Sequence, residues 1–154
     1  MLKEKVLFLW ENDEDIIKMF FMFFQQHGFL TDKVSSFDEC VEFCKNTPPN
    51  VLITCRLRDQ PDTILGLIQR LRSDSSIPYI PIIVGYADFT HKEKESGYQE
   101  MFQAGANACF GYPFDIKDVL EQVKVLAQNP SATNLVDRQS ERLYNKKKSG
   151  DSES

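Results

Sequence analysis

The chain has 154 residues, 42% of them apolar, and a formal net charge of −5. This length allows one domain with one sizeable core. The negative charge argues against a surface that binds nucleic-acid backbones or anionic lipids. No apolar stretch has the flanks of a signal peptide or the roughly 18 residues that span a bilayer. We therefore expect a cytoplasmic protein that binds neither nucleic acid nor membranes.

Short apolar runs alternate with segments of helical period, which is typical of βα units in a parallel sheet. Five strands are predicted, at residues 5–10, 29–34, 50–55, 80–85 and 107–111. The first, third and fourth have a continuous rather than an alternating apolar character, as expected for strands covered on both faces. Right-handed crossovers then favour an α/β fold of the doubly wound, flavodoxin-like type, with a five-stranded parallel sheet between two layers of helices.

Five helices are predicted between and after these strands. Asp13 can cap the first, and Gly28 can end it in a left-handed conformation. Ser36 and Glu39 form a capping box for the second, and Asp115 can cap the fifth. The expected helices, with their caps, cover residues 13–27, 36–45, 62–72, 95–104 and 115–128.

The sequence changes character after Asn129. Residues 129–154 are mostly polar and include the run Lys146-Lys147-Lys148. Too few apolar side chains are present to offset the entropy of ordering this segment, which favours a disordered tail. A short helix that docks on a partner is the alternative, because four apolar residues lie near helical spacing: Leu135, Val136, Leu143 and Tyr144.

The four cysteines form neither a Cys-x-x-Cys pair nor a small disulfide framework. We expect reduced thiols, with Cys55 and Cys109 inside strands as small buried apolar groups. Cys40 and Cys44 lie four residues apart on one predicted helix. They could hold a metal only with other ligands, and the chain has just two histidines to offer.

Four strand ends carry short motifs, and a tight turn precedes the fifth strand. The motifs are Glu11-Asn12-Asp13, Thr54-Cys55, Gly85-Tyr86-Ala87 and Tyr112-Pro113, and the turn is Ala104-Gly105-Ala106. This succession resembles the receiver domain of two-component response regulators over residues 4–128. The resemblance implies a receiver-like domain at residues 1–128, followed by the tail.

The resemblance also assigns positions in the phosphorylation site of receivers. There an acidic pair and an acceptor aspartate bind magnesium, while a lysine and a threonine or serine hold the phosphoryl group. Here the corresponding residues are Glu11 and Asn12, Thr54, Tyr112 and Tyr86, respectively. The aromatic residue that many receivers use as a rotamer switch falls on Cys109.

These substitutions predict a degenerate phosphorylation site. A threonine hydroxyl without an activating base cannot accept a phosphoryl group. Glu11, with Asp13, remains only a weak magnesium candidate, because magnesium generally needs several carboxylate or phosphate oxygens. The rings of Tyr86 and Tyr112 would either fill the phosphoryl pocket or pack at its rim. We therefore expect no catalysis, no cofactor and no bound metal.

The predicted function is that of a stand-alone, atypical receiver, an interaction or adaptor module in bacterial-type phosphorelay signalling that needs no phosphorylation. The partner would be a kinase, a regulator or a second copy of the chain. One candidate surface is on the first helix, where Met22 falls on the polar side and Met19 lies at its boundary. The other is the face that receivers use for pairing, which the resemblance places at Tyr98 and Lys117.

Two other functions stay open. A working phosphorelay receiver could use a non-standard acceptor, either Asp13 or Asp59. A flavodoxin-like binder of a small ligand is the second alternative. Against it, no glycine-rich phosphate loop follows the first strand, where the acidic residues at 11–15 would repel a phosphate.

Overall fold

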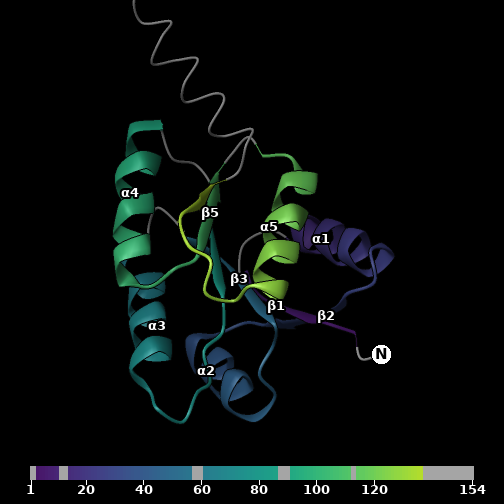
Figure 1. Cartoon of the computed structure of the whole chain (residues 1–154), viewed down its shortest axis with the longest axis horizontal. Helices are drawn as coiled ribbons and strands as arrows, with labels where there is room; N and C mark the ends of the chain where they lie inside the picture. The colour runs from purple at the N-terminus through teal and green to yellow at the C-terminus, as the bar shows by residue number, and fades with distance from the viewer. Residues whose placement is uncertain (1–2, 11–13, 57–60, 87–90, 112–113, 137–154) are drawn as a thin grey trace, which may run out of the picture.

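The computed structural model describes residues 3–10, 14–56, 61–86, 91–111 and 114–136. These residues form one sheet with helices on both of its faces (Figure 1). The strands are β1 (Lys5–Leu9), β2 (Leu30–Val34), β3 (Val51–Arg56), β4 (Ile82–Tyr86), β5 (Ala108–Gly111) and β6 (Leu135–Val136). The helices are α1 (Glu14–Gln26), α2 (Phe37–Asn46), α3 (Pro61–Ser73), α4 (His91–Ala104) and α5 (Ile116–Gln128). Among the described helices, none combines the length and the apolar character that crossing a bilayer requires.

The strands lie in the order β2-β1-β3-β4-β5-β6, and every neighbouring pair is parallel. This confirms the predicted doubly wound fold, with one strand more than expected. The chain leaves β1 toward β2 on one side and returns to β3 on the other. In sheets of this type the ligand crevice lies beyond the carboxyl ends of the strands, where this reversal occurs.

Each face of the sheet has its own apolar core. Alternate strand residues such as Leu7, Leu52 and Val84 pack with residues of α2, α3 and α4. Their neighbours Phe8 and Ile53 pack with residues of α1 and α5 on the opposite face. Figure 1 shows the same division of the helices between the two sides of the sheet. Coverage on both faces explains why the apolar residues of these strands are consecutive rather than alternating with polar ones.

Local capping signals predicted several helix ends. Ser36 Oγ accepts from Glu39 N at 3.1 Å, and the Glu39 carboxylate accepts from Ser35 N at 3.2 Å. Asp115 Oδ1 accepts from Lys117 N at 2.9 Å at the start of α5. Gly28 has a φ of 89°, as a left-handed residue after a helix should. The caps at Ser36 and Asp115 and the turn at Gly28 are therefore confirmed, while the Glu39 carboxylate of the predicted capping box binds Ser35 N instead of Ser36 N. The proposed cap Asp13 lies outside the described residues.

The cysteines are free and buried, as predicted for structural thiols. Cys40 and Cys44 do share helix α2, facing the core. Within the described part of the chain, no three His, Cys, Asp or Glu side chains lie close enough together to hold a metal ion.

The segment after α5 differs from the prediction of a disordered or helical tail. Leu135 and Val136 form the short strand β6, which pairs with Ala108 and Cys109 of β5. A helix through these two residues is therefore wrong. These residues form a strand rather than a helix because β5 would otherwise be an edge strand with unpaired backbone groups. Leu143 and Tyr144 lie outside the described residues.

A buried asparagine fastens this segment to the sheet. Asn107 is 0% exposed, and its Oδ1 accepts from Ile82 N at 2.8 Å and from a terminal nitrogen of Arg72 at 2.9 Å. Its Nδ2 donates to Pro130 O at 3.1 Å and Ala132 O at 3.0 Å. One amide therefore connects α3, β4 and the chain that leads into β6.

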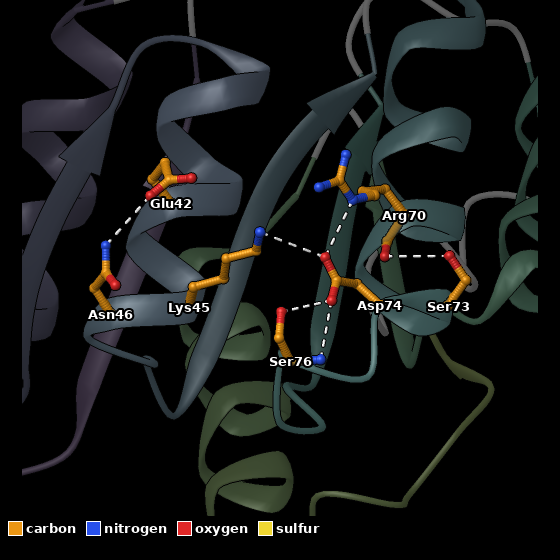
Figure 2. Close-up of polar contacts among 7 residues, drawn as sticks. All are labelled: Glu42, Lys45, Asn46, Arg70, Ser73, Asp74 and Ser76. Atoms are coloured by element: carbon orange, nitrogen blue, oxygen red, sulfur yellow. Dashed lines mark hydrogen bonds and ion pairs between the residues drawn. The ribbon is translucent and has the colours of Figure 1, made fainter.

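A second polar cluster joins α2 to the turn after α3 (Figure 2). Asp74 accepts hydrogen bonds from Ser76 Oγ at 2.6 Å and Ser76 N at 2.9 Å. The same carboxylate lies 3.6 Å from Lys45 Nζ and 3.4 Å from Arg70 Nε. The hydrogen bonds from Ser76, helped by these cations, lower the pKa of Asp74 to about 2.

Candidate functional site

The candidate site is the carboxyl edge of the sheet, where β1, β3, β4 and β5 end. Five residues proposed for its chemistry lie outside the described residues: Glu11, Asn12, Asp13, Asp59 and Tyr112. The roles predicted for them stay predictions. The structure does describe Thr54, Tyr86 and the side chains directly beneath this edge.

Thr54 lies inside the sheet rather than at its rim. Strand β3 continues to Arg56, one residue further than predicted, and Thr54 pairs with Leu9 of β1. The threonine is 0% exposed, and its Oγ1 donates to Leu9 O at 3.1 Å. A hydroxyl that is buried and already hydrogen-bonded is a poor acceptor for a phosphoryl group from solvent.

Tyr86 is the last residue of β4, and its side chain packs inward. It is 1% exposed and belongs to the core beneath α2, α3 and α4. Its ring meets Tyr98 of α4 edge-on, with 5.0 Å between the ring centroids. This is a favourable geometry for two aromatic rings. The end of β4 therefore carries a large ring that is anchored to α4.

The same contact corrects the surface predicted at Tyr98. Tyr98 is only 9% exposed, so it cannot form part of an open partner surface. It shares the inner face of α4 with the fully buried Met101, three residues further along the helix. Lys117, the other residue predicted on that side, is exposed on α5.

Cys109, which the resemblance places at the aromatic switch position, is 0% exposed on β5. Burial raises the pKa of its thiol well above the usual value. The side chain is therefore a small, neutral part of the core, on the same face of the sheet as Tyr86. It has no ring that could move between the core and the surface.

An aromatic cluster lies beneath the edge on the other face of the sheet. We use this name for Trp10, Phe20, Phe110 and Phe114. The Trp10 and Phe110 rings stack with centroids 6.2 Å apart, and Phe20 stacks on Phe114 at 5.7 Å. Phe110 and Phe114 meet edge-on at 4.9 Å. Dense apolar packing thus directly underlies the β1 and β5 ends of the edge.

Gly85 makes room for this cluster. A Cβ atom at this position would lie 2.7 Å from Phe110 Cζ and 3.1 Å from Trp10 Cη2. The aromatic cluster is not predictable from local sequence patterns, because its members come from four separate elements or loops. The available signal was Trp10 at the end of an apolar strand, together with a glycine inside β4.

The methionine surface predicted on α1 is exposed. Met22 is 63% exposed and Met19 is 42% exposed. The opposite side of the same helix buries Ile17, Phe20 and Phe24. The helix therefore presents two adaptable apolar side chains to solvent in addition to its core face.

Comparison with solved structures gives close matches over most of the chain. A two-component response regulator of the LuxR family from Aurantimonas superposes with a TM-score of 0.73 at 8% identity, covering 96% of this chain and 99% of that one. A response regulator receiver protein from Pseudomonas putida gives 0.65 at 21% identity, over 80% and 98%. A sensor protein from Polaromonas gives 0.65 at 24% identity, over 83% and 98%.

The fold is that of a receiver domain. No family model and no curated protein sequence matches the chain. The receiver fold is therefore established by shape. This fold, together with the positions that the sequence resemblance assigns to its carboxyl edge, is the basis for the function proposed below.

Proposed function

We propose that this chain is an atypical receiver that works through protein contacts in two-component signalling, without phosphorylation and without catalysis of its own. The observation that carries the proposal is the burial of Tyr86 against Tyr98, with 5.0 Å between the rings. A phosphoryl group at this edge would need a small hydroxyl donor at the end of β4. The chain instead places there a ring that is part of the core.

The packing of Tyr86 also opposes a conformational response. A ligand shifts an equilibrium only by the difference in its affinity for the two states. Exposing a buried aromatic side chain costs about 1.5–3 kcal/mol from the lost burial alone. Any signal that passed from the edge to α4 by moving Tyr86 would have to supply at least that much.

The residues assigned to the acceptor and to the acidic pair also support a function without phosphorylation. The resemblance to receivers assigns Thr54 to the position of the acceptor aspartate, and the Thr54 hydroxyl already donates to Leu9 O. By the resemblance to receivers, Asn12 replaces one carboxylate of the acidic pair, which leaves Glu11, with Asp13 directly after Asn12, as the weak magnesium candidate. Magnesium keeps most of its water unless carboxylates or phosphates replace it. We infer that the protein needs neither a metal nor a cofactor.

The partner that we propose is a protein, either a kinase or a regulator of the same pathway or a second copy of this chain. The exposed methionines of α1 offer a contact surface, since flexible thioether side chains adapt to different partners. Lys117 on α5 offers a second contact point. Regulation then comes from partner binding or abundance rather than from a phosphorylation cycle.

The direct test is incubation of the full chain with acetyl phosphate and magnesium, followed by intact-mass spectrometry. We expect no added phosphoryl group, whereas a receiver with an acceptor aspartate, treated in parallel, gains one. Asp13→Asn and Asp59→Asn should then behave like the parent chain. A phosphorylated fraction that disappears in either variant would establish a working receiver with a non-standard acceptor.

A further inference from the structure

A cavity of about 250 Å³ opens between α5 and β6. It is lined by Asp118, Glu121, Gln122 and Val125 of α5 and by Asn134, Leu135 and Val136. None of the residues assigned to the degenerate phosphorylation site lines it. The cavity exists because residues 134–136 return to the sheet beside α5.

Two acceptor oxygens in the lining have no donor among the described residues. Gln122 is 6% exposed, and its Nε2 donates to Cys109 O at 3.2 Å. A carbonyl oxygen can only accept, so this bond fixes the amide with Oε1 turned away from Cys109. That Oε1 is buried without a hydrogen-bond partner, and so is Asp118 Oδ2. A buried acceptor without a donor is unfavourable, so both atoms favour a ligand that donates.

The acidic charge and the apolar walls of the cavity indicate which class of ligand it can bind. Asp118 makes no ion pair within the described part of the chain, and the nearby Glu121 has only the exposed Lys124, at 3.8 Å. An anion would be repelled here. Val125, Leu135 and Val136 add apolar wall beside the acceptors. A cationic head on an aliphatic stem, as in lysine and arginine, matches both features.

We propose that the α5–β6 cavity binds the cationic head group of a lysine or arginine side chain. Two sources have this chemistry: a basic segment of a partner protein, and this chain's own run Lys146-Lys147-Lys148. The run begins about ten residues after Val136, and an extended chain of that length spans roughly 33 Å. The proposal does not depend on the loss of phosphorylation.

The chemistry is tested by NMR of the Gln122 side-chain amide during titration of the full chain with N-acetyl-arginine amide. The neutral control is N-acetyl-citrulline amide, which has nearly the same shape but no charge. We expect the arginine probe to shift the Gln122 signals in a saturable way and the citrulline probe to leave them in place. Equal responses to the two probes would overturn the proposal.

The matched variants are Asp118→Asn and Asp38→Asn, which each remove one acid from the first turn of a helix. Asp118→Asn should weaken binding of the arginine probe about tenfold, the usual scale for losing a hydrogen bond to a charged group. Asp38→Asn should have no effect. Glu121→Gln, at an exposed position, provides a second variant if Asp118→Asn folds poorly. Unchanged affinity in both cavity variants would contradict the proposal.

The source is identified with a full chain that carries Lys146→Gln, Lys147→Gln and Lys148→Gln together. If the chain's own run occupies the cavity, this variant shifts the Gln122 signals without any probe and binds the arginine probe more tightly. If the variant and the parent bind the probe equally, a partner's basic segment is the supported source.

Discussion

At the scale of single residues, the packing beneath the carboxyl edge depends on one missing methyl group. Gly85 of β4 lies against Phe110 and Trp10, so that an added Cβ would approach Phe110 Cζ to 2.7 Å. Contacts this short force a ring or the backbone to move. Glycine is required at this position because the rings of Phe110 and Trp10 pack closely against it.

Gly85→Ala is therefore expected to destabilise the protein by about 1–3 kcal/mol, the usual cost of overpacking a well-filled core. The measurement is urea unfolding, followed by the fluorescence of the single tryptophan, Trp10. An unchanged urea midpoint would show that the aromatic cluster can rearrange around the added methyl group at little cost in stability.

Gly66→Ala is the matched control. Gly66 lies inside α3, and nothing would lie within 4 Å of an added Cβ there. Alanine is favoured over glycine in a helix interior by roughly 0.5–1 kcal/mol. This substitution should therefore stabilise the protein by a similar amount, opposite in sign to Gly85→Ala.

At the scale of elements, Asp74 ties the end of α2 to the turn between α3 and β4, as Figure 2 shows. The pKa of this carboxyl is about 2 in the folded protein, below its ordinary value of 3.8. A depressed folded-state pKa means that the ionised carboxylate stabilises the fold above pH 4. That contribution is lost as the pH falls through about 2.

Asp74→Asn should accordingly lower the urea midpoint at neutral pH. The difference between the variant and the parent should shrink as the pH falls below 4 and be lost near pH 2. The check is a series of unfolding curves across this range, with Asp38→Asn on α2 as an exposed acidic control. A difference that persists unchanged at pH 2 would mean that the Asp74 charge is not the cause.

The attachment of β6 depends on Asn107. Its amide nitrogen donates to two carbonyls of the segment before β6, at 3.1 and 3.0 Å. Asn107→Ala should therefore release this segment, and exchange of the Leu135 amide hydrogen should accelerate roughly tenfold, since two bonds contribute about 0.5–1.5 kcal/mol each. Leu135 is a suitable reporter because its N–H donates to the backbone oxygen of residue 107, which the substitution retains.

Tyr79→Phe serves as the control for Asn107→Ala. It removes only one acceptor of the Asn107 amide, a hydroxyl on a half-exposed side chain. It should change Leu135 exchange little. If the Leu135 amide exchanges as slowly in Asn107→Ala as in the parent chain, strand pairing with β5 is enough to hold β6 in place.

These elements also show what sequence reasoning can reach. The caps at Ser36 and Asp115 and the turn at Gly28 are local, and each was predicted from a few neighbouring residues. Strand β6 was missed because a segment of two residues is too short to show the alternation of apolar and polar residues that indicates a strand. The burial of Tyr98 was missed because it depends on Tyr86, which is distant in sequence. Thr54 was placed too near the strand end because strand length is decided by pairing with β4.

At the scale of the whole molecule, the receiver fold has large aromatic side chains packed beneath its carboxyl edge. On one face of the sheet Tyr86 is anchored to α4, and on the other the aromatic cluster packs beneath β1 and β5. Both features favour a single conformation. In the function that we propose, the protein acts through what binds to it, and the exposed methionines of α1 and the α5–β6 cavity are two places where binding can occur.

Trp10 provides the most direct measurement of this central claim. It is the only tryptophan in the chain, it directly precedes Glu11, and it stacks on Phe110. Its fluorescence is recorded while beryllofluoride, a mimic of the phosphoryl group, is added to the full chain together with magnesium. We predict no change at any concentration beyond that of a free tryptophan control. A saturable, magnesium-dependent change in the Trp10 emission would contradict the account.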